Sequence, residues 1–170
     1  MTLVGFRAKN HPQQTKVRRG NSAVDDRALP ASDFEPLNKR YRFTIDVAAS
    51  EQNAKCARFY TYKDNGLEQS WSGERVYCNP PFSDIRPWVQ KAWRERDAQI
   101  TVMLLPANRT EQGWWQEHIE PRRDRDSSVL RTQFLGGRLR FLKPGQSVIG
   151  PNERPPFGCV LCVWDWRGDR

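Results

Sequence analysis

The sequence of 170 residues has no long hydrophobic run, and histidine and cysteine are scarce in it. Its longest apolar stretch, 102–105 with its neighbours, is far shorter than the roughly 20 residues of a membrane-spanning helix. The N-terminal residues are basic and lack the apolar stretch of a signal peptide, so we expect neither a membrane protein nor an exported one. The 7 Trp and 8 Phe are far too many for a disordered chain, and the length supports one folded domain.

Cysteine is too scarce for a disulfide framework, with only 4 residues scattered along the chain. Cys159 and Cys162 have C-x-x-C spacing, but residues 158–164 have the apolar pattern of a β-strand. Residues three apart on a strand point to opposite faces, which is a poor geometry for gripping one metal ion. We therefore predict buried, reduced cysteines, no metal site and a cytoplasmic protein.

Positive charge is in excess, because 28 Lys and Arg against 20 Asp and Glu give a formal net charge of +8. Five basic and no acidic side chains lie in residues 1–24, and a second basic stretch spans residues 121–143. Clustered Lys and Arg release counterions from phosphate backbones, so this distribution favours a nucleic-acid partner over mere solubility. We predict a flexible basic arm over residues 1–24 and a single folded domain over residues 25–170.

Strand and helix patterns alternate along the folded part of the chain. The predicted strands are 42–47, 58–62, 75–78, 100–105 and 159–164, and the predicted helices begin at 32, 50, 83 and 110. Two strand-like segments, 129–135 and 138–142, flank Gly136-Gly137, which predicts a β-hairpin. This order predicts an α/β fold with a mainly parallel sheet.

The tetrapeptide Asn79-Pro80-Pro81-Phe82 follows the predicted strand 75–78. Two prolines cannot continue a central strand, so the tetrapeptide falls beyond the carboxyl end, where open α/β sheets bind ligands. Asn79 offers a carbonyl acceptor and Phe82 a planar apolar face. These groups suit an amino group on a planar conjugated ring, held so that its nitrogen attacks an electrophilic methyl group. A proline-terminated strand without any activity fits the tetrapeptide alone equally well.

The tetrapeptide resembles the [D/N/S]-P-P-[Y/F/W] motif of S-adenosylmethionine-dependent amino-methyltransferases. With segments 43–50, 64–67 and 102–107, it is similar to the phage DNA N-6-adenine methyltransferase (Dam) family, from about Asp25 to Trp164. The resemblance implies a compact Rossmann-like methyltransferase sheet, mostly parallel, with a C-terminal antiparallel hairpin. It also implies an adenine-specific DNA methyltransferase with S-adenosylmethionine as cofactor and double-stranded DNA as partner, in a bacterial or phage-infected cell.

The resemblance also implies roles for individual residues. The residues implied to bind the target adenine, flipped out of the duplex, are Asn79, Pro80, Pro81 and Phe82. The residues implied to contact the cofactor are Asp46, Val47, Ala48, Ser50, Asp64 and Asn79. The side chains that we expect to contact DNA are Arg131, Arg138, Arg140, Lys143, Asn108 and Arg109.

Some residues depart from the family pattern. Phe82 stands where Tyr is frequent, Leu29-Pro30 stands where Thr-Pro is common, and the loop after the first strand lacks the glycines of a G-x-G fingerprint. Only about thirty residues separate Asp46 from Asn79, too few for two complete βα units, which predicts a shortened sheet. Asp46 and Asp64 also fit ordinary turn residues.

Two alternatives to DNA adenine methylation stay open from the sequence. One is methylation of another planar amino or amide group, in RNA or in a protein. The other is a catalytically inactive DNA-binding module that keeps the methyltransferase fold. The oligomeric state is not readable from the residues.

Overall fold

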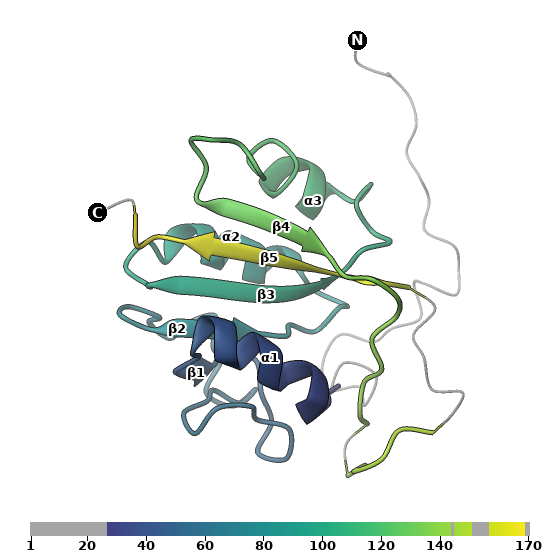
Figure 1. The fold of residues 1–170 in the computed structure, drawn as a ribbon. Coiled ribbons are helices and arrows are strands. Elements are labelled where there is room, and N and C mark those ends of the chain that lie inside the picture. The colour runs from purple at the N-terminus through teal and green to yellow at the C-terminus, as the bar shows by residue number, and fades with distance from the viewer. Residues whose placement is uncertain (1–26, 144, 151–156, 169–170) are drawn as a thin grey trace.

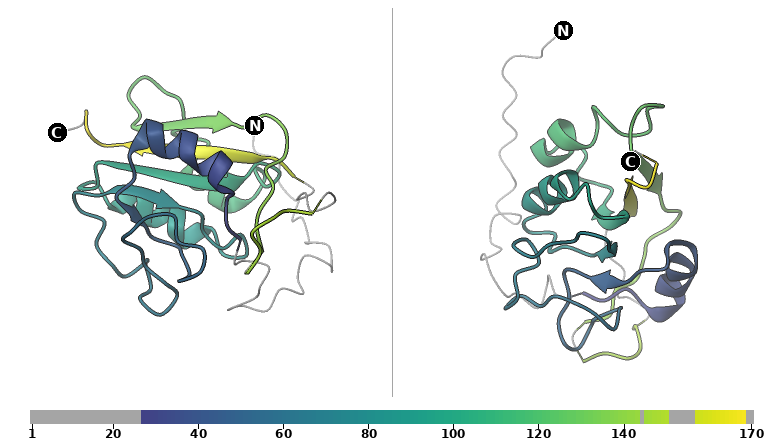
Figure 2. Two further views of the ribbon diagram at one scale, coloured as in Figure 1. Left: turned by 60° about the horizontal axis from the view of Figure 1, so that its bottom comes forward. Right: turned by 90° about the vertical axis from the view of Figure 1, so that its left-hand side faces the viewer.

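The computed structural model describes residues 27–143, 145–150 and 157–168. The predicted basic arm, residues 1–24, lies outside these described residues. A five-stranded sheet forms the middle of three layers, with α1 on one face and α2 and α3 on the other (Figures 1 and 2). Within the described part of the chain, no helix has the length and hydropathy needed to cross a membrane.

The sheet has the strand order β1-β2-β3-β5-β4. Its strands are β1 (Ile45–Asp46), β2 (Arg75–Cys78), β3 (Ile100–Pro106), β4 (Leu130–Phe134) and β5 (Cys159–Asp165). The helices are α1 (Ala31–Tyr41), α2 (Arg86–Arg94) and α3 (Gly113–His118). β1, β2 and β3 are parallel, whereas β5 runs antiparallel to both β3 and β4.

The prediction of a mainly parallel sheet is wrong, because the described sheet is mixed. Two of its pairings are parallel and two are antiparallel. The apolar residues 159–164 are buried almost throughout, so β5 needs a neighbour on each side and lies between β3 and β4. The mixed α/β class itself is as predicted.

The hairpin predicted around Gly136-Gly137 does not form. β4 pairs with β5 instead, from Leu130 opposite Trp164 to Phe134 opposite Val160. The partner expected for β4, residues 138–142, contributes only a single antiparallel bridge between Leu142 and Ala28. β4 pairs with β5 so that β5 has a hydrogen-bonded neighbour along both of its edges. The turn residues Gly136-Gly137 alone do not decide which strand β4 pairs with.

Side chains alternate between two apolar clusters, one on each face of the sheet. On β3, Val102 and Leu104 face the side covered by α1, called here the α1 side, while Met103 faces α2 and α3. Cys159 lies in the α1-side cluster and Cys162 in the other. The two cysteines therefore point to opposite faces, as their spacing predicted.

The helices begin and end differently from the predictions. α1 begins at Ala31 without a side-chain cap, and Pro36 is tolerated on its exposed face. α2 begins at Arg86 and not at Ser83, because Pro87 is favoured in a first turn. It buries the predicted apolar face, including Trp88 and Val89. α3 is shorter than the predicted 110–119.

The helix predicted over 50–57 is replaced by turns and bends. The Asn53 side chain accepts a hydrogen bond from the Ser50 N–H (2.7 Å), and the Asp46 carboxylate accepts one from the Lys55 N–H (3.1 Å). These side-chain acceptors compete with helical hydrogen bonds. The strand predicted at 58–62 is reduced to one bridge between Phe59 and Asp46.

Candidate active site

The three parallel strands end at one edge of the sheet, called here the carboxyl edge. Asp46 closes β1, Asn79 follows β2 and Asn108 follows β3. In Figure 1 this edge lies on the right, where the β3 arrow points and where the chain descends after β4. The fold thus brings the loop after β1 and the motif after β2 to the same edge.

The chain changes direction across the sheet at β1. On one side, the Asp46 N–H donates to the Arg58 carbonyl (3.0 Å) and the Tyr60 N–H donates to the Asp46 carbonyl (2.9 Å). On the other side, the Val47 N–H donates to the Tyr77 carbonyl of β2 (3.1 Å). After β1 the chain first bonds to one side of β1 through residues 58–60, and it then returns on the other side as β2. The direction in which the chain adds strands therefore reverses between β1 and β2, and open α/β sheets bind ligands at such a switch point.

A small pocket lies at this switch point. It is lined by Arg27, Ala28, Leu29, Asp46, Ala48, Asn53, Lys55, Tyr77 and Asn79. Its interior of about 10 Å³ holds roughly one water molecule. Residues 27–29 line one side of the pocket, and the Ala28 backbone is bonded to Leu142 (3.0 and 2.8 Å). A larger ligand needs the lining residues to move apart.

Asp46 is the buried charge of the pocket, with 3% of its surface exposed. Its carboxylate accepts hydrogen bonds from the N–H groups of Ala48 (3.3 Å) and Lys55 (3.1 Å). Burial raises the Asp46 pKa to about 6, although these bonds and the Lys55 charge act in the opposite direction. Asp46 therefore shapes its own loop and still carries negative charge at neutral pH.

Of the other residues predicted to contact the cofactor, Ala48 and Asn79 line the pocket, and Val47, Ser50 and Asp64 do not. Ala48 lines the pocket, whereas the Val47 side chain is buried in the cluster beneath α2 and α3. Ser50 lies outside the pocket lining, and its carbonyl accepts hydrogen bonds within its own turn. Asp64 is exposed in a turn, where it accepts from the Thr61 N–H (2.8 Å) and hydroxyl (2.7 Å). In this structure Asp64 occupies the position of a turn residue.

A hydrogen bond of the Asn79 side chain connects the motif to Arg27, the first described residue. β2 ends at Cys78, and Pro80 is buried directly after Asn79. The Asn79 amide nitrogen donates to the Arg27 carbonyl oxygen (2.7 Å). This bond orients the amide and leaves its oxygen, an acceptor, for a second partner.

Phe82 is held from several directions. Its ring meets Phe141 edge-on, with centroids 6.3 Å apart, and Phe157 at 6.0 Å. The Arg109 guanidinium donates to the Phe82 carbonyl oxygen (2.5 Å). Arg109, predicted to contact DNA, thus fixes the backbone of the motif from the end of β3.

The basic segment 138–143 lies beside the motif although it is not a strand. Phe141 contacts Phe82, and Leu142 pairs with Ala28. Arg138 is exposed and Arg140 half-buried. These contacts bring the predicted DNA-contact residues Arg138, Arg140 and Lys143 close to the carboxyl edge in sequence and space. Asn108 is exposed at the same edge.

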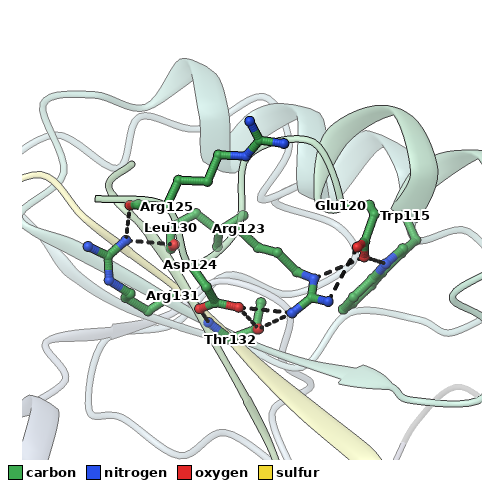
Figure 3. Close-up of polar contacts among 8 residues, drawn as sticks. All are labelled: Trp115, Glu120, Arg123, Asp124, Arg125, Leu130, Arg131 and Thr132. Carbon is green, nitrogen blue, oxygen red and sulfur yellow. Dashed lines mark hydrogen bonds and ion pairs between the residues drawn. The ribbon is translucent and has the colours of Figure 1, made fainter. Parts of the chain in front are cut away.

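Arg131 lies away from the pocket. It belongs to β4, and three strands separate it from β1, a distance of roughly 20 Å at the usual strand spacing. Its guanidinium donates to the carbonyls of Arg125 (3.0 Å), Ser128 (2.6 Å) and Leu130 (3.2 Å), as Figure 3 shows in part. Its position is explained by holding the loop before β4.

The same loop covers the outer edge of β4 (Figure 3). Asp124 accepts from the Thr132 N–H (2.7 Å), and its own N–H donates to the Leu130 carbonyl (2.9 Å). Arg123 links Asp124 (3.0 Å) to Glu120 (2.9 Å). These contacts satisfy backbone groups that an edge strand otherwise leaves open to other chains.

Comparison with known proteins identifies the family. The sequence profile of the family described as DNA N-6-adenine-methyltransferase (Dam) matches residues 17–166. The chain belongs to this family. The resemblance drawn from the sequence is therefore confirmed.

Two phage proteins of this family illustrate the similarity. The chain is 36% identical over 130 residues to the DNA N-6-adenine-methyltransferase of Escherichia phage T1, covering 69% of this chain and 54% of that protein. It is 37% identical over 66 residues to the protein of the same name from Haemophilus phage HP1 (strain HP1c1), covering 38% of each. The chain thus spans about half the length of the T1 relative.

Six lining residues of the pocket were not predicted from the sequence: Arg27, Ala28, Leu29, Asn53, Lys55 and Tyr77. Leu29 was noted only as a departure from the Dam family pattern, and it is buried in the α1-side cluster. Tyr77 precedes Asn79 by two residues, so the period of a strand places both on one face. Lys55 becomes visible only when the loop folds around Asp46.

Proposed function

We propose that this chain transfers a methyl group from S-adenosylmethionine to the N6 amino group of adenine in DNA. The observation that carries the proposal is the position of Asn79 at the carboxyl end of β2, beside the pocket at the β1–β2 switch point. Membership of the Dam family supports the same reaction. We infer accordingly that the sheet is a compact Rossmann-like methyltransferase sheet and that residues 25–170 form the methyltransferase domain.

The residues around the pocket fit the methyl donor chemically. Asp46 and Lys55 supply opposite charges, and Asn53 and Asn79 supply amides. A zwitterionic amino-acid group is complementary to this set, and a shift of residues 27–29 gives it room. When bound, the donor supplies a sulfonium-activated methyl group.

Asn79 and Phe82 are proposed to hold the target base. The free oxygen of the Asn79 amide accepts a hydrogen bond from the adenine amino group, and the Phe82 ring packs on the base. The amino nitrogen forms the bond to the methyl carbon while the carbon–sulfur bond breaks, and one amino proton passes to solvent. Because a base inside the duplex cannot reach these groups, the adenine is flipped out. Positioning and the acceptor at Asn79 lower the barrier.

The partner in this proposal is double-stranded DNA. Phe141 contacts Phe82 of the motif, and Leu142 pairs with Ala28, which lines the pocket; this supports contacts of Arg138, Arg140 and Lys143 with the phosphates that flank the flipped base. We propose that Asn108 adds a polar contact at the same edge. DNA as substrate also places the protein in the cytoplasm of the cell that carries that DNA.

Transfer of labelled methyl groups tests this function. The protein is incubated with labelled S-adenosylmethionine and, in parallel, methylation-free duplex DNA, RNA and protein. Label in N6-methyladenine from DNA supports the proposal. Label in RNA or protein alone redirects the substrate, and binding of DNA without any transfer indicates an inactive DNA-binding module.

A further inference from the structure

The hydroxyl group of Tyr77 is buried and has no hydrogen-bond partner among the described residues. Only 1% of the Tyr77 surface is exposed. Its ring is held by Phe34, edge-on at 5.1 Å between centroids, and by Phe43 at 5.3 Å. A buried hydroxyl without a partner is destabilising, so its presence needs an explanation.

The position of Tyr77 supplies that explanation. Tyr77 is the register partner of Asp46 across the β1–β2 pair, so both side chains lie on one face of the sheet. Both residues line the pocket, together with Asn79. Burial and the nearby Asp46 charge raise the Tyr77 pKa well above its usual range, so the hydroxyl keeps its proton and remains a donor.

The charges beside Tyr77 define what kind of group it meets. Asp46 is negative, and Lys55, which is partly buried, lines the same pocket. In the free protein the Lys55 charge already acts on Asp46, and a neutral ring such as adenine adds no charge that either residue can pair with. A group carrying an ammonium and a carboxylate satisfies Asp46 with the first and Lys55 with the second. The carboxylate retains lone pairs for a neutral donor, and the Tyr77 hydroxyl is a donor of the pocket lining that has no partner among the described residues.

We propose that the Tyr77 hydroxyl donates a hydrogen bond to the carboxylate at the amino-acid end of the bound methyl donor. The inference rests on the proposed function, because it assigns a positioning residue to the same pocket. Tyr77 acts by fixing the donor beside Asn79, so that the methyl group faces the amino nitrogen held there. The hydroxyl without a partner in the free protein is then satisfied in the complex.

Tyr77→Phe removes this hydroxyl and keeps the ring. The probe is S-adenosylhomocysteine, compared with its decarboxylated analogue, which keeps the ammonium and the nucleoside. Calorimetry should show that Tyr77→Phe binds S-adenosylhomocysteine about tenfold more weakly than the wild type, since a bond to a charged group is lost. The wild type should bind S-adenosylhomocysteine more tightly than the decarboxylated analogue. The ratio of these two affinities should be about tenfold smaller in Tyr77→Phe. Without ligand, Tyr77→Phe should unfold at a higher temperature.

Thr101→Val is the matched control. The Thr101 hydroxyl is also fully buried and without a partner in the described chain, but Thr101 does not line the pocket. It lies on β3 between Ile100 and Val102, which face the α1 side, so it points to the opposite face. Thr101→Val should raise the unfolding temperature in the same way and leave both affinities unchanged.

The outcomes separate this inference from the proposed function. If the wild type binds neither compound, the assignment of the pocket to the methyl donor fails together with the inference. If the wild type binds S-adenosylhomocysteine and Tyr77→Phe binds it equally well, only the role of Tyr77 is wrong. Equal weakening of both ligands places the hydroxyl against the nucleoside and overturns the inference. Even if the variant folds poorly, equal binding of the two ligands by the wild type would overturn the inference, because no group of the pocket would then recognise the carboxylate.

Discussion

The Asn79 side chain donates a hydrogen bond of 2.7 Å to the carbonyl oxygen of Arg27. One residue of the motif thereby holds residues 27–29, which line the pocket beside it. The same residues are also tied to Leu142 through the two backbone bonds of Ala28. The motif, the N-terminal side of the pocket and the basic segment after β4 are consequently linked at one point.

Asn79→Asp separates this link from the acceptor role of Asn79. An aspartate keeps an acceptor oxygen, and the [D/N/S]-P-P-[Y/F/W] motif that the tetrapeptide resembles includes Asp at this position, but an aspartate has no N–H for the Arg27 carbonyl. We expect faster amide hydrogen exchange at Ala28 and Leu142, with methyl transfer retained within about tenfold of the wild type. Asn108→Asp is the control and should leave exchange at Ala28 unchanged. Unchanged protection of Ala28 in Asn79→Asp would show that the link does not hold this segment.

Arg109→Ala tests whether Arg109 positions the motif or binds DNA. The variant loses the hydrogen bond to the Phe82 carbonyl, so the motif backbone shifts relative to the base. We expect kcat to fall at least about tenfold, because small misplacements of reacting groups are costly. DNA affinity should change by less than about twofold. A variant with weaker DNA binding and unchanged kcat would support the DNA-contact role predicted from the sequence and contradict the positioning role.

The Arg138→Ala, Arg140→Ala double variant tests the basic segment. If both side chains contact phosphates, the plot of log affinity for duplex DNA against log salt concentration should be less steep for the double variant than for the wild type. The difference in slope should be up to about 2. Arg131→Ala is the control, since its guanidinium holds carbonyls of its own loop. Equal slopes in wild type and double variant, measured by fluorescence anisotropy, would remove the segment from the DNA interface.

Asp46 predicts two pH effects of opposite sign. Folding raises its pKa from 3.8 to about 6, so between these values the folded state holds a proton that the unfolded state releases. The free energy of unfolding without ligand should therefore decrease as pH rises through this window. Affinity for S-adenosylhomocysteine should instead increase with pH and level off above about 6, because only the ionised carboxylate attracts the ammonium.

Asp46→Asn is the matched variant for both effects. It has no titrating group at this position, so we expect both pH dependences to flatten in calorimetry and in denaturant titrations. Wild-type affinity that stays constant from pH 5 to 7 would mean that Asp46 serves only its own loop.

The local pattern of residues predicted the strands that are buried and the place of the motif. The apolar run of β3 and the alternation in β2 are strong local features, and Pro80 and Pro81 define where β2 ends. The two faces of β5 followed from the spacing of Cys159 and Cys162. Because parallel strands end at one edge, the sequence alone allows Asp46 and Asn79 to be placed near each other.

The features that failed depend on partners distant in sequence. β4 pairs with β5 because β5 is buried on both edges, which Gly136-Gly137 cannot reveal. The loop after β1 is organised by the Asp46 carboxylate in place of a helix. The sequence also did not show that Arg109 and Arg131 donate to carbonyl groups of the protein, and the contact of these side chains with DNA stays a prediction.

Methyl transfer by wild type and Asn79→Ala tests the central proposal most directly. Both proteins are incubated with labelled S-adenosylmethionine and methylation-free duplex DNA, and the digested nucleosides are separated. We expect label in N6-methyladenine with the wild type and a loss of at least about 100-fold with Asn79→Ala, whose circular dichroism stays that of a folded protein. Equal labelling by the two proteins, or no label in adenine with the wild type, would contradict the account.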